Sequence, residues 1–193
     1  MKTKLILFLF FIFPTLSYAQ IKYEKEYGLK LEDVPQKAID YISELNLDTK
    51  IKWYKEEGID RSTIEAKTKY NSYKYSIEFD SLGVLEDIEM EMKYKNIPDS
   101  ISSLVDYYFE RSFDKKKVCK TQIQYTGDKD DLMTIFTLSP NVRPIKTVTI
   151  NYEVVAKVKY DGEYQKMEFL FNEQGSMINK AIIVEKNTDI LEY

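Results

Sequence analysis

Apolar and polar residues alternate most regularly in two parts of the chain, residues 63–80 and residues 147–172. Alternation with a period of two is typical of strands that bury one face. Each part is interrupted by a short polar turn, Asn-Ser in the first and Asp-Gly in the second, and this arrangement predicts an antiparallel hairpin. A turn glycine follows each hairpin, Gly83 in one case and Gly175 in the other. The pattern therefore predicts one hairpin module that occurs twice.

An amphipathic helix is predicted before each hairpin, because apolar residues recur at helical spacing in residues 38–45 and 101–108. Pro35 and Pro98 precede these stretches, and proline suits a first helical turn because the N–H that it lacks would have no partner there. We predict an α+β fold of two tandem repeats, each a helix packed on a small antiparallel β-sheet. The predicted organisation is a signal peptide (1–19), a first repeat (20–95), a second repeat (96–187) with an insertion at 118–146, and a C-terminal tail (188–193).

Weaker alternation predicts further strands. They lie at 20–31, where the strand would be an edge, at 51–57, 84–94 and 176–185, and at 118–125 and 132–138 within the insertion. The run Lys115-Lys116-Lys117 follows the second helical stretch. Lysines at that end of a helix offset its dipole, so we expect this run to close the helix.

Four aromatic residues indicate which faces are buried. Phe79 and Phe171 occupy equivalent places in the two hairpins, and we expect both to point into the core between helix and sheet. Trp53 and Tyr54 are adjacent in a predicted strand, so they should face opposite ways.

The N-terminus has the layout of a secretory signal peptide. Lys2 and Lys4 precede an apolar run from Leu5 to Leu16, and small residues lead to a cleavage point after Ala19. The run is shorter than the roughly 18–20 residues that cross a bilayer. We therefore expect a periplasmic or secreted protein with no membrane span after the signal is removed.

Composition narrows the possible partners. Without residues 1–19 the chain has 26 basic residues (28 − 2) against 32 acidic ones, a net charge of −6, which argues against nucleic acid as a partner. Cys119 is the only cysteine, so an intramolecular disulfide is excluded and packing has to stabilise the fold.

The sequence contains no histidine, which excludes catalytic triads that use imidazole and zinc sites with histidine ligands. Acidic residues are densest at 80–91, but alternate residues of one strand form a ladder instead of a pair that faces across a sugar. At residues 127–131, neither a glycine nor a distal glutamate falls at the offset that a calcium loop requires. We therefore predict no enzyme activity, no catalytic residues, no cofactor and no metal site.

The helix that follows Pro35, the strand that holds Trp53 and the first hairpin carry a family resemblance. With them the chain resembles the PepSY-like secreted proteins of Bacteroidetes, in which such strands end in an aromatic residue, an acidic or amide residue and a turn glycine, here 79–83 and 171–175. Tandem repeats of this kind are similar to the beta-lactamase inhibitory protein architecture, whose paired sheets form a concave face that grips a partner enzyme. The resemblance implies an inhibitor-like binding module. The sequence departs from that architecture because Cys119 has no disulfide partner and the insertion makes the repeats unequal.

If the helices cover the apolar face of each sheet, the opposite face carries mixed charges. A long polar sheet face fits the docking of a protein, so we predict a secreted or periplasmic, non-enzymatic module that docks a protein or peptide. The predicted partner-binding residues are Lys67, Lys69, Lys74, Glu78, Asp87, Glu89, Glu91, Lys157, Lys159, Lys166 and Glu168. The alternative is a binder of small ligands or glycans that stack on exposed aromatic residues. A deep aromatic-lined pocket would favour that alternative.

Overall fold

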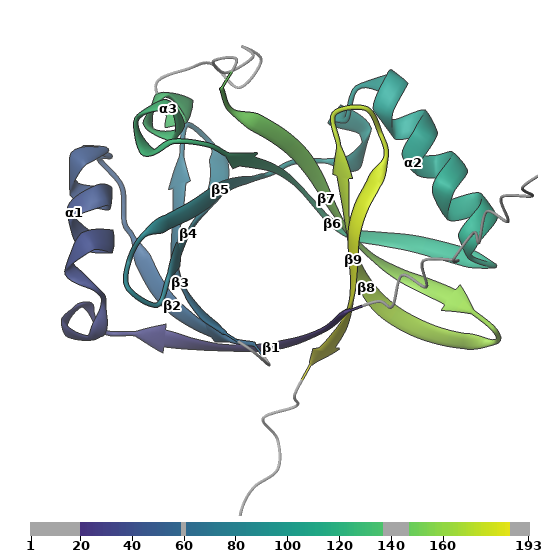
Figure 1. Ribbon diagram of the computed structural model, residues 1–193, viewed down its shortest axis with the longest axis horizontal. Coiled ribbons are helices and arrows are strands. Elements are labelled where there is room, and N and C mark those ends of the chain that lie inside the picture. Colours follow the sequence, from purple (N-terminus) through teal and green to yellow (C-terminus); the bar gives the residue numbers. More distant parts are fainter. Residues whose placement is uncertain (1–19, 59–60, 137–146, 186–193) are drawn as a thin grey trace, which may run out of the picture.

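The protein is described by a computed structural model that covers residues 20–58, 61–136 and 147–185. In this part of the chain, nine strands form one sheet in sequence order and three α-helices lie outside it (Figure 1). The strands are β1 (Gln20–Leu29), β2 (Lys52–Glu57), β3 (Ser62–Tyr70), β4 (Tyr73–Asp80), β5 (Leu85–Glu91), β6 (Lys115–Thr126), β7 (Thr149–Tyr160), β8 (Glu163–Asn172) and β9 (Met177–Glu185). The helices are α1 (Gln36–Glu44), α2 (Asp99–Ser112) and α3 (Lys129–Met133), with 3-10 helices η1 (Leu31–Asp33), η2 (Tyr94–Asn96) and η3 (Thr134–Phe136).

The sheet is closed, because each strand pairs with the next in antiparallel fashion and β1 pairs in parallel with β9. The predicted α+β class is confirmed. The two separate small sheets that the sequence suggested are instead one sheet, since β5 pairs with β6 across the boundary drawn between the repeats. β1 was expected at an edge but has a neighbour on each side. In an open sheet, β1 and β9 would be edge strands with unpaired backbone N–H and C=O groups. Because the sheet is closed, these groups pair with each other.

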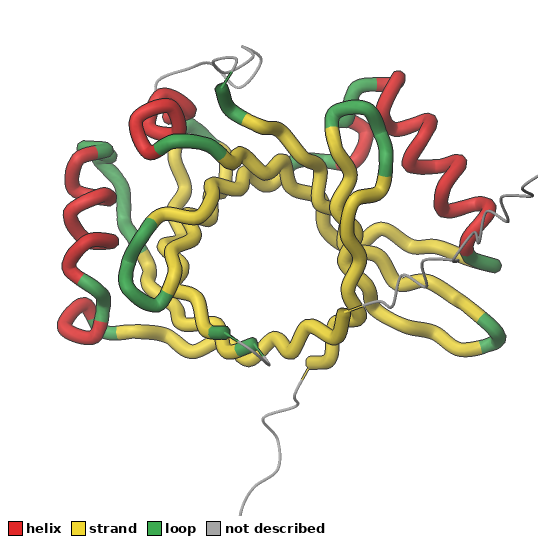
Figure 2. The backbone as a smooth tube through the Cα atoms, in the orientation of Figure 1, coloured by secondary structure: helices red, strands yellow, loops and turns green. Residues whose placement is uncertain are grey.

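The hydrophobic core lies outside the ring of strands, between the outer face of the sheet and the helices. Figure 2 shows the strands enclosing a ring with every helix on its outside. The Tyr41 ring of α1 contacts that of Phe79 at 5.7 Å between centroids, and the Phe109 ring of α2 contacts that of Phe169 at 4.8 Å. Phe79 and Phe171 are both 0% exposed, which confirms their predicted place. The outer face of the sheet is therefore the apolar one, and the inner face is left for polar residues.

Matching turns follow β4 and β8, and each packs against a helix. Asp80 Oδ1 accepts hydrogen bonds from two backbone N–H groups at 2.8 and 2.9 Å, and Asn172 Oδ1 does the same at 2.9 and 3.0 Å. Gly83 has a φ of +79°, and an added Cβ would lie 2.8 Å from Pro35 Cβ. Gly175 has a φ of +73°, and an added Cβ would lie 2.8 Å from a side chain of α2. Both glycines permit a left-handed backbone and a close approach to a helix.

The strand predicted at 132–138 is wrong for the residues that the structure describes. These form α3 and η3, and positions 137 and 138 lie outside the described residues. Leu132, Ile135 and Phe136 are buried at helical spacing, and the Phe136 ring packs 4.8 Å from that of Tyr75. This short helical segment therefore covers the part of the outer sheet face around Tyr75.

The lysine run that was expected to close the second helix begins a strand instead. α2 ends at Ser112, and Lys115 is the first residue of β6. Lys116, the next residue, forms an ion pair with Asp106 of α2. The run is therefore tied to the helix from the neighbouring strand.

The predicted signal peptide and C-terminal tail lie outside the described residues. Among the residues described, we find no helix with the length and apolar character needed to cross a membrane.

Candidate functional site

The inner face of the closed sheet encloses a cavity of about 460 Å³, which we call the lumen. Every one of the nine strands contributes to its wall. Its acidic lining residues are Glu26, Glu56, Glu65, Glu78, Glu89, Glu153 and Glu168, and its lysines are Lys67, Lys120 and Lys166. Acidic groups thus outnumber basic ones in the wall, so the lumen favours positive charge.

A second cavity of about 530 Å³ adjoins the lumen and is called the mouth. The two cavities share four residues: Glu65, Lys67, Lys120 and Gln122. The mouth adds Lys69, Lys74 and Glu91. Because the two spaces have a common wall, a ligand at the mouth would be in contact with groups of the lumen.

Lys67 is held at the centre of this shared wall. Its Nζ lies 2.6 Å from Glu26 Oε2, 2.9 Å from Glu65 Oε2 and 4.8 Å from the centroid of the Tyr54 ring. Burial alone would lower the pKa of Lys67, but the hydrogen bonds and charges of Glu26 and Glu65 outweigh it and raise that pKa above its ordinary value. Ser76 Oγ also donates to Glu65. This lysine stays charged and fixes the orientation of two acids.

Three amide side chains form two hydrogen-bonded ladders across the inner face. In the first, Asn151 Nδ2 donates to Gln124 Oε1 at 3.1 Å, and Gln124 Nε2 donates to Asp87 Oδ2 at 3.1 Å. In the second, Gln122 Nε2 donates to Glu89. Gln122 Oε1 has no hydrogen-bond partner among the described residues, although the side chain is only 2% exposed. In the first ladder both the amide oxygen and the amide nitrogen of Gln124 are bonded, whereas in the second only the nitrogen of Gln122 is.

Glu89 is a buried acid of the lumen with a raised pKa. It is 6% exposed, and burial raises the pKa of its carboxyl well above the ordinary value, with further increases from the charges of Glu153, Glu78 and Asp87. Lys120 opposes this shift. Glu78, Asp87 and Glu89 each place a carboxylate oxygen within 4.8 Å of the others.

Beyond the lumen, the inner face continues onto β6, β7 and β8 as a row of lysines, which we call the basic arm. Lys115 pairs with Lys159, and Lys117 pairs with Lys157, which in turn pairs with Lys166. Like charges directly opposite each other destabilise a sheet. The opposed lysines therefore lower the stability of the fold, so stability does not explain why lysine occupies these positions. The members of the basic arm are Lys115, Lys117, Lys157, Lys159 and Lys166, and Lys166 also lines the lumen where the two meet.

A β-bulge places the two halves of β6 on the same inner face. The register shifts between Val118 and Lys120, with Cys119 as the extra residue. Lys117 before the bulge and Lys120 after it therefore share a face, although plain alternation would separate them. The sequence showed no signal for this bulge.

The predicted partner-binding residues divide into three groups. Lys67, Glu78, Glu89, Lys166 and Glu168 line the lumen, with Asp87 beside Glu89; Lys69, Lys74 and Glu91 line the mouth; Lys157 and Lys159 lie on the basic arm. Glu89 lies on the polar sheet face where it was predicted, but it is buried because the sheet closes around it. Alternation could also have identified Glu65 and Glu153, which lie on the same faces of their strands as predicted residues, whereas Gln122 had no signal of its own.

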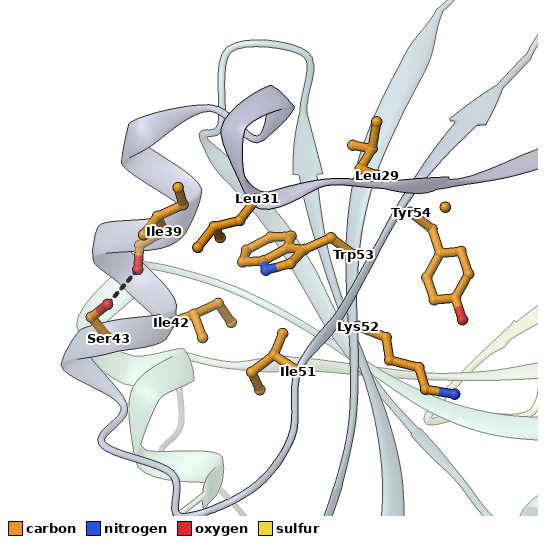
Figure 3. Close-up of a pocket in the computed structure, with 10 residues that line it drawn as sticks. Leu29, Leu31, Ile39, Ile42, Ser43, Ile51, Lys52, Trp53 and Tyr54 are labelled. Atoms are coloured by element: carbon orange, nitrogen blue, oxygen red, sulfur yellow. Dashed lines mark hydrogen bonds between the residues drawn. The ribbon is translucent and has the colours of Figure 1, made fainter.

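An apolar pocket of about 710 Å³ lies outside the ring, between α1 and the strands β1 and β2. Figure 3 shows Trp53 directed toward α1 near Leu31 and Ile42, while Tyr54 points to the other side of its strand. The opposite orientations predicted for Trp53 and Tyr54 are thus confirmed. Since no other lining residue is aromatic, this pocket does not offer two rings on one side for a sugar to stack on.

The chain was compared with known proteins. No protein-family model matches it, and no curated protein gives a significant match. A DUF2874 family protein from Bacteroides ovatus is similar in structure, with a TM-score of 0.49 and 12% identity, over 78% of this chain and 89% of that one. A DUF2874 family protein from Bacteroides uniformis gives 0.47 and 12%, over 77% and 89%. A BLIP-like protein from Bacteroides fragilis gives 0.45 and 18%, over 77% and 86%. At these values neither fold nor function is transferred to this chain.

Proposed function

We propose that the protein is a secreted or periplasmic, non-enzymatic binding module that captures a segment of a protein or peptide on the inner face of its sheet. The proposal includes an origin of the fold in two tandem helix-on-sheet repeats and kinship with PepSY-like secreted proteins. The matching turns at Gly83 and Gly175 support the repeats. The absence of histidine from the sequence supports a role without catalysis.

The observation that carries the proposal is the division of charge along one continuous face. The lumen is predominantly acidic, and the basic arm next to it presents lysines in directly opposed pairs. Tyr164, at 53% exposed, lies beside the arm with its ring centroid 5.2 Å from Lys157 Nζ and 6.0 Å from Lys159 Nζ. A partner segment with basic residues at one end and acidic residues at the other would match this charge distribution. Its basic end would bind in the lumen and its acidic end would bind on the basic arm.

Closure of the sheet limits the kind of partner. A broad protein surface has no access to a closed inner face, whereas an extended loop or chain terminus is narrow enough to enter at the mouth. Charged groups across an interface add specificity and speed association more than they add affinity. We therefore expect binding that is selective for charge order and weakens with salt.

The test uses synthetic peptides of equal length and composition in which basic and acidic residues are separated in blocks or mixed evenly. Fluorescence anisotropy measures their affinity for the purified protein in the presence of EDTA. The block peptide should bind at least about tenfold more tightly, a difference of about 1.4 kcal/mol. Equal affinities would remove the observation on which the proposal rests.

Charge reversal then locates the site. Lys117→Glu with Lys157→Glu should weaken binding of the block peptide about tenfold or more. The matched control is Lys37→Glu with Lys95→Glu, two exposed lysines outside the inner face, which should leave affinity unchanged. The same loss in both double variants would show that overall charge, and not this face, governs binding.

A further inference from the structure

We propose that the lumen contains a binding site for a divalent cation, Ca²⁺. The proposed coordinating groups are the carboxylates of Glu78, Asp87 and Glu89 and the amide oxygen of Gln122. This proposal does not depend on peptide capture, which is measured in EDTA, although the cation would occupy part of the same lumen. It also differs from the acidic segment 127–131, which lacks the pattern of a calcium loop.

The backbone register brings the three carboxylates together. Glu78 of β4 lies directly opposite Asp87 of β5, and Glu89 follows two residues later on the same strand, so all three side chains share the inner face. Their nearest oxygens all lie within 4.8 Å of one another. Oxygens this close can contact one cation at the same time, since even opposite ligands of Ca²⁺ stand about 4.8 Å apart at a typical bond of about 2.4 Å. Ca²⁺ accepts irregular coordination, whereas Mg²⁺ demands nearly ideal octahedral geometry, so we take Ca²⁺ as the bound ion.

The buried amide of Gln122 gives an independent indication of a ligand. Its Nε2 is bound to Glu89, which holds the amide against the acidic cluster, and its Oε1 is buried without a hydrogen-bond partner among the described residues. Buried acceptors are rarely left unsatisfied in folded proteins. In the neighbouring ladder the amide of Asn151 supplies the donor to Gln124, but the residue opposite Gln122 is Glu153, whose side chain has no amide N–H to donate. A coordinated cation would satisfy Gln122 Oε1 and the carboxylates together.

The donor atoms specify the class of cation. All four are carboxylate or amide oxygens, which hard cations such as Ca²⁺ prefer. Zinc and copper favour histidine or thiolate ligands, and the sequence has no histidine and one cysteine. Lys120 lines the same cavity, so its ammonium group competes for the acids. Removal of that charge should strengthen cation binding.

The experiment titrates metal-free protein, prepared with EDTA and desalted, with CaCl₂ or MgCl₂ at constant ionic strength. Calorimetry should show one saturable site for Ca²⁺ with a Kd of about 10⁻⁴–10⁻³ M, as in extracellular calcium modules, and weaker binding of Mg²⁺. Ca²⁺ should also raise the melting temperature in a concentration-dependent way. No heat of binding and no shift at millimolar Ca²⁺ would overturn the proposal.

Three variants identify the ligands. Glu89→Gln should abolish the Ca²⁺ response, Gln122→Met should weaken it at least about fivefold because it removes only the amide, and Lys120→Gln should tighten it. The control is Glu91→Gln, on the same strand and the same face, whose carboxylate instead lies 3.0 Å from Lys74 Nζ; it should keep the full response. If Glu89→Gln does not fold, Asp87→Asn takes its place. An unchanged response in the first variant, or an equal loss in the control, contradicts the assignment.

Discussion

Two phenylalanines carry much of the outer core. Phe79 and Phe171 are each fully buried, Phe79 against Tyr41 and Trp53, and Phe171 against Tyr108 at 5.6 Å between centroids. Truncation leaves a cavity, so Phe79→Ala and Phe171→Ala should each lower the free energy of unfolding by about 3–5 kcal/mol. Urea denaturation measures this, with Leu82→Ala, at a position that is 70% exposed, as the control. A cost below about 1 kcal/mol for either phenylalanine would mean that the outer face is not the core.

The Asp106 carboxylate contributes to the free energy of unfolding, and this contribution depends on pH. Burial raises the pKa of Asp106, but hydrogen bonds from Lys116 and Tyr94 outweigh it, so the net direction is downward. Tyr94 OH donates to Asp106 at 2.8 Å. Since the folded pKa lies below the unfolded one, this contribution is present above the unfolded pKa and is lost as pH falls through the folded pKa.

Asp106→Asn should therefore lower the melting temperature at neutral pH, and the difference from wild type should shrink as the pH is lowered below about 4. The effect is modest because the Asp106 side chain is 43% exposed. Glu110→Gln on the same helix is the control. A difference between wild type and Asp106→Asn that stays constant across the pH range would exclude the carboxylate as its source.

The alternation of apolar and polar residues predicted which face of the sheet a side chain lies on. It predicted less well how far that side chain is buried. Alternation assigned Phe79 to the core and Glu89 to the opposite face, and both assignments are confirmed. It could not show that Glu89 is buried, because burial there comes from strands far away in the sequence that close the ring. For the same reason the partly unsatisfied Gln122 could not be recognised.

Elements with a long, regular pattern were predicted with bounds close to those found. β3, β4, β7 and β8 show this, since each has a clear apolar face and a marked turn. The short segment at 132–136 fits alternation and helical spacing almost equally, and only its packing on Tyr75 decides in favour of a helix. The lysine run at 115–117 was placed at the end of the helix because lysines there offset its dipole, whereas it begins β6. The bulge at Cys119 had no sequence signal.

The basic arm allows a prediction at the level of a strand pair. Lys117 lies directly opposite Lys157, and like charges in such a pair are unfavourable. Lys117→Glu should therefore raise the free energy of unfolding by about 0.2–1 kcal/mol, even though it should weaken peptide capture. Lys95→Glu outside the sheet should change stability little. A loss of stability in Lys117→Glu would mean that the lysine makes a favourable contact in the fold.

At the scale of the whole molecule, the sequence predicted what each half contains but not how the halves join. Hairpins and helices are local, and their patterns lie within short windows. The joining contacts are the pairing of β5 with β6 and the parallel pairing of β1 with β9, and parallel pairing between chain ends has no local sequence signal. Closure turned two expected polar sheet faces into one enclosed wall.

Closure has a consequence for unfolding that two independent repeats would not share. The β5–β6 seam holds four residue pairs, from Ile88 with Tyr125 to Glu91 with Gln122, and the β1–β9 seam holds five. Trp53 is the only tryptophan and lies in the core under α1. Its fluorescence therefore reports one half of the ring.

We expect one cooperative transition, in which Trp53 fluorescence and far-ultraviolet circular dichroism give the same midpoint. Phe171→Ala changes the core under α2, in the other half, and should shift the Trp53 midpoint as far as the dichroism midpoint. Two independently folding repeats would instead leave the Trp53 transition in place while the dichroism split into two steps. One shared midpoint would show that the β5–β6 and β1–β9 seams couple the two halves. Through these contacts, a cavity at Phe171 can destabilise the surroundings of Trp53.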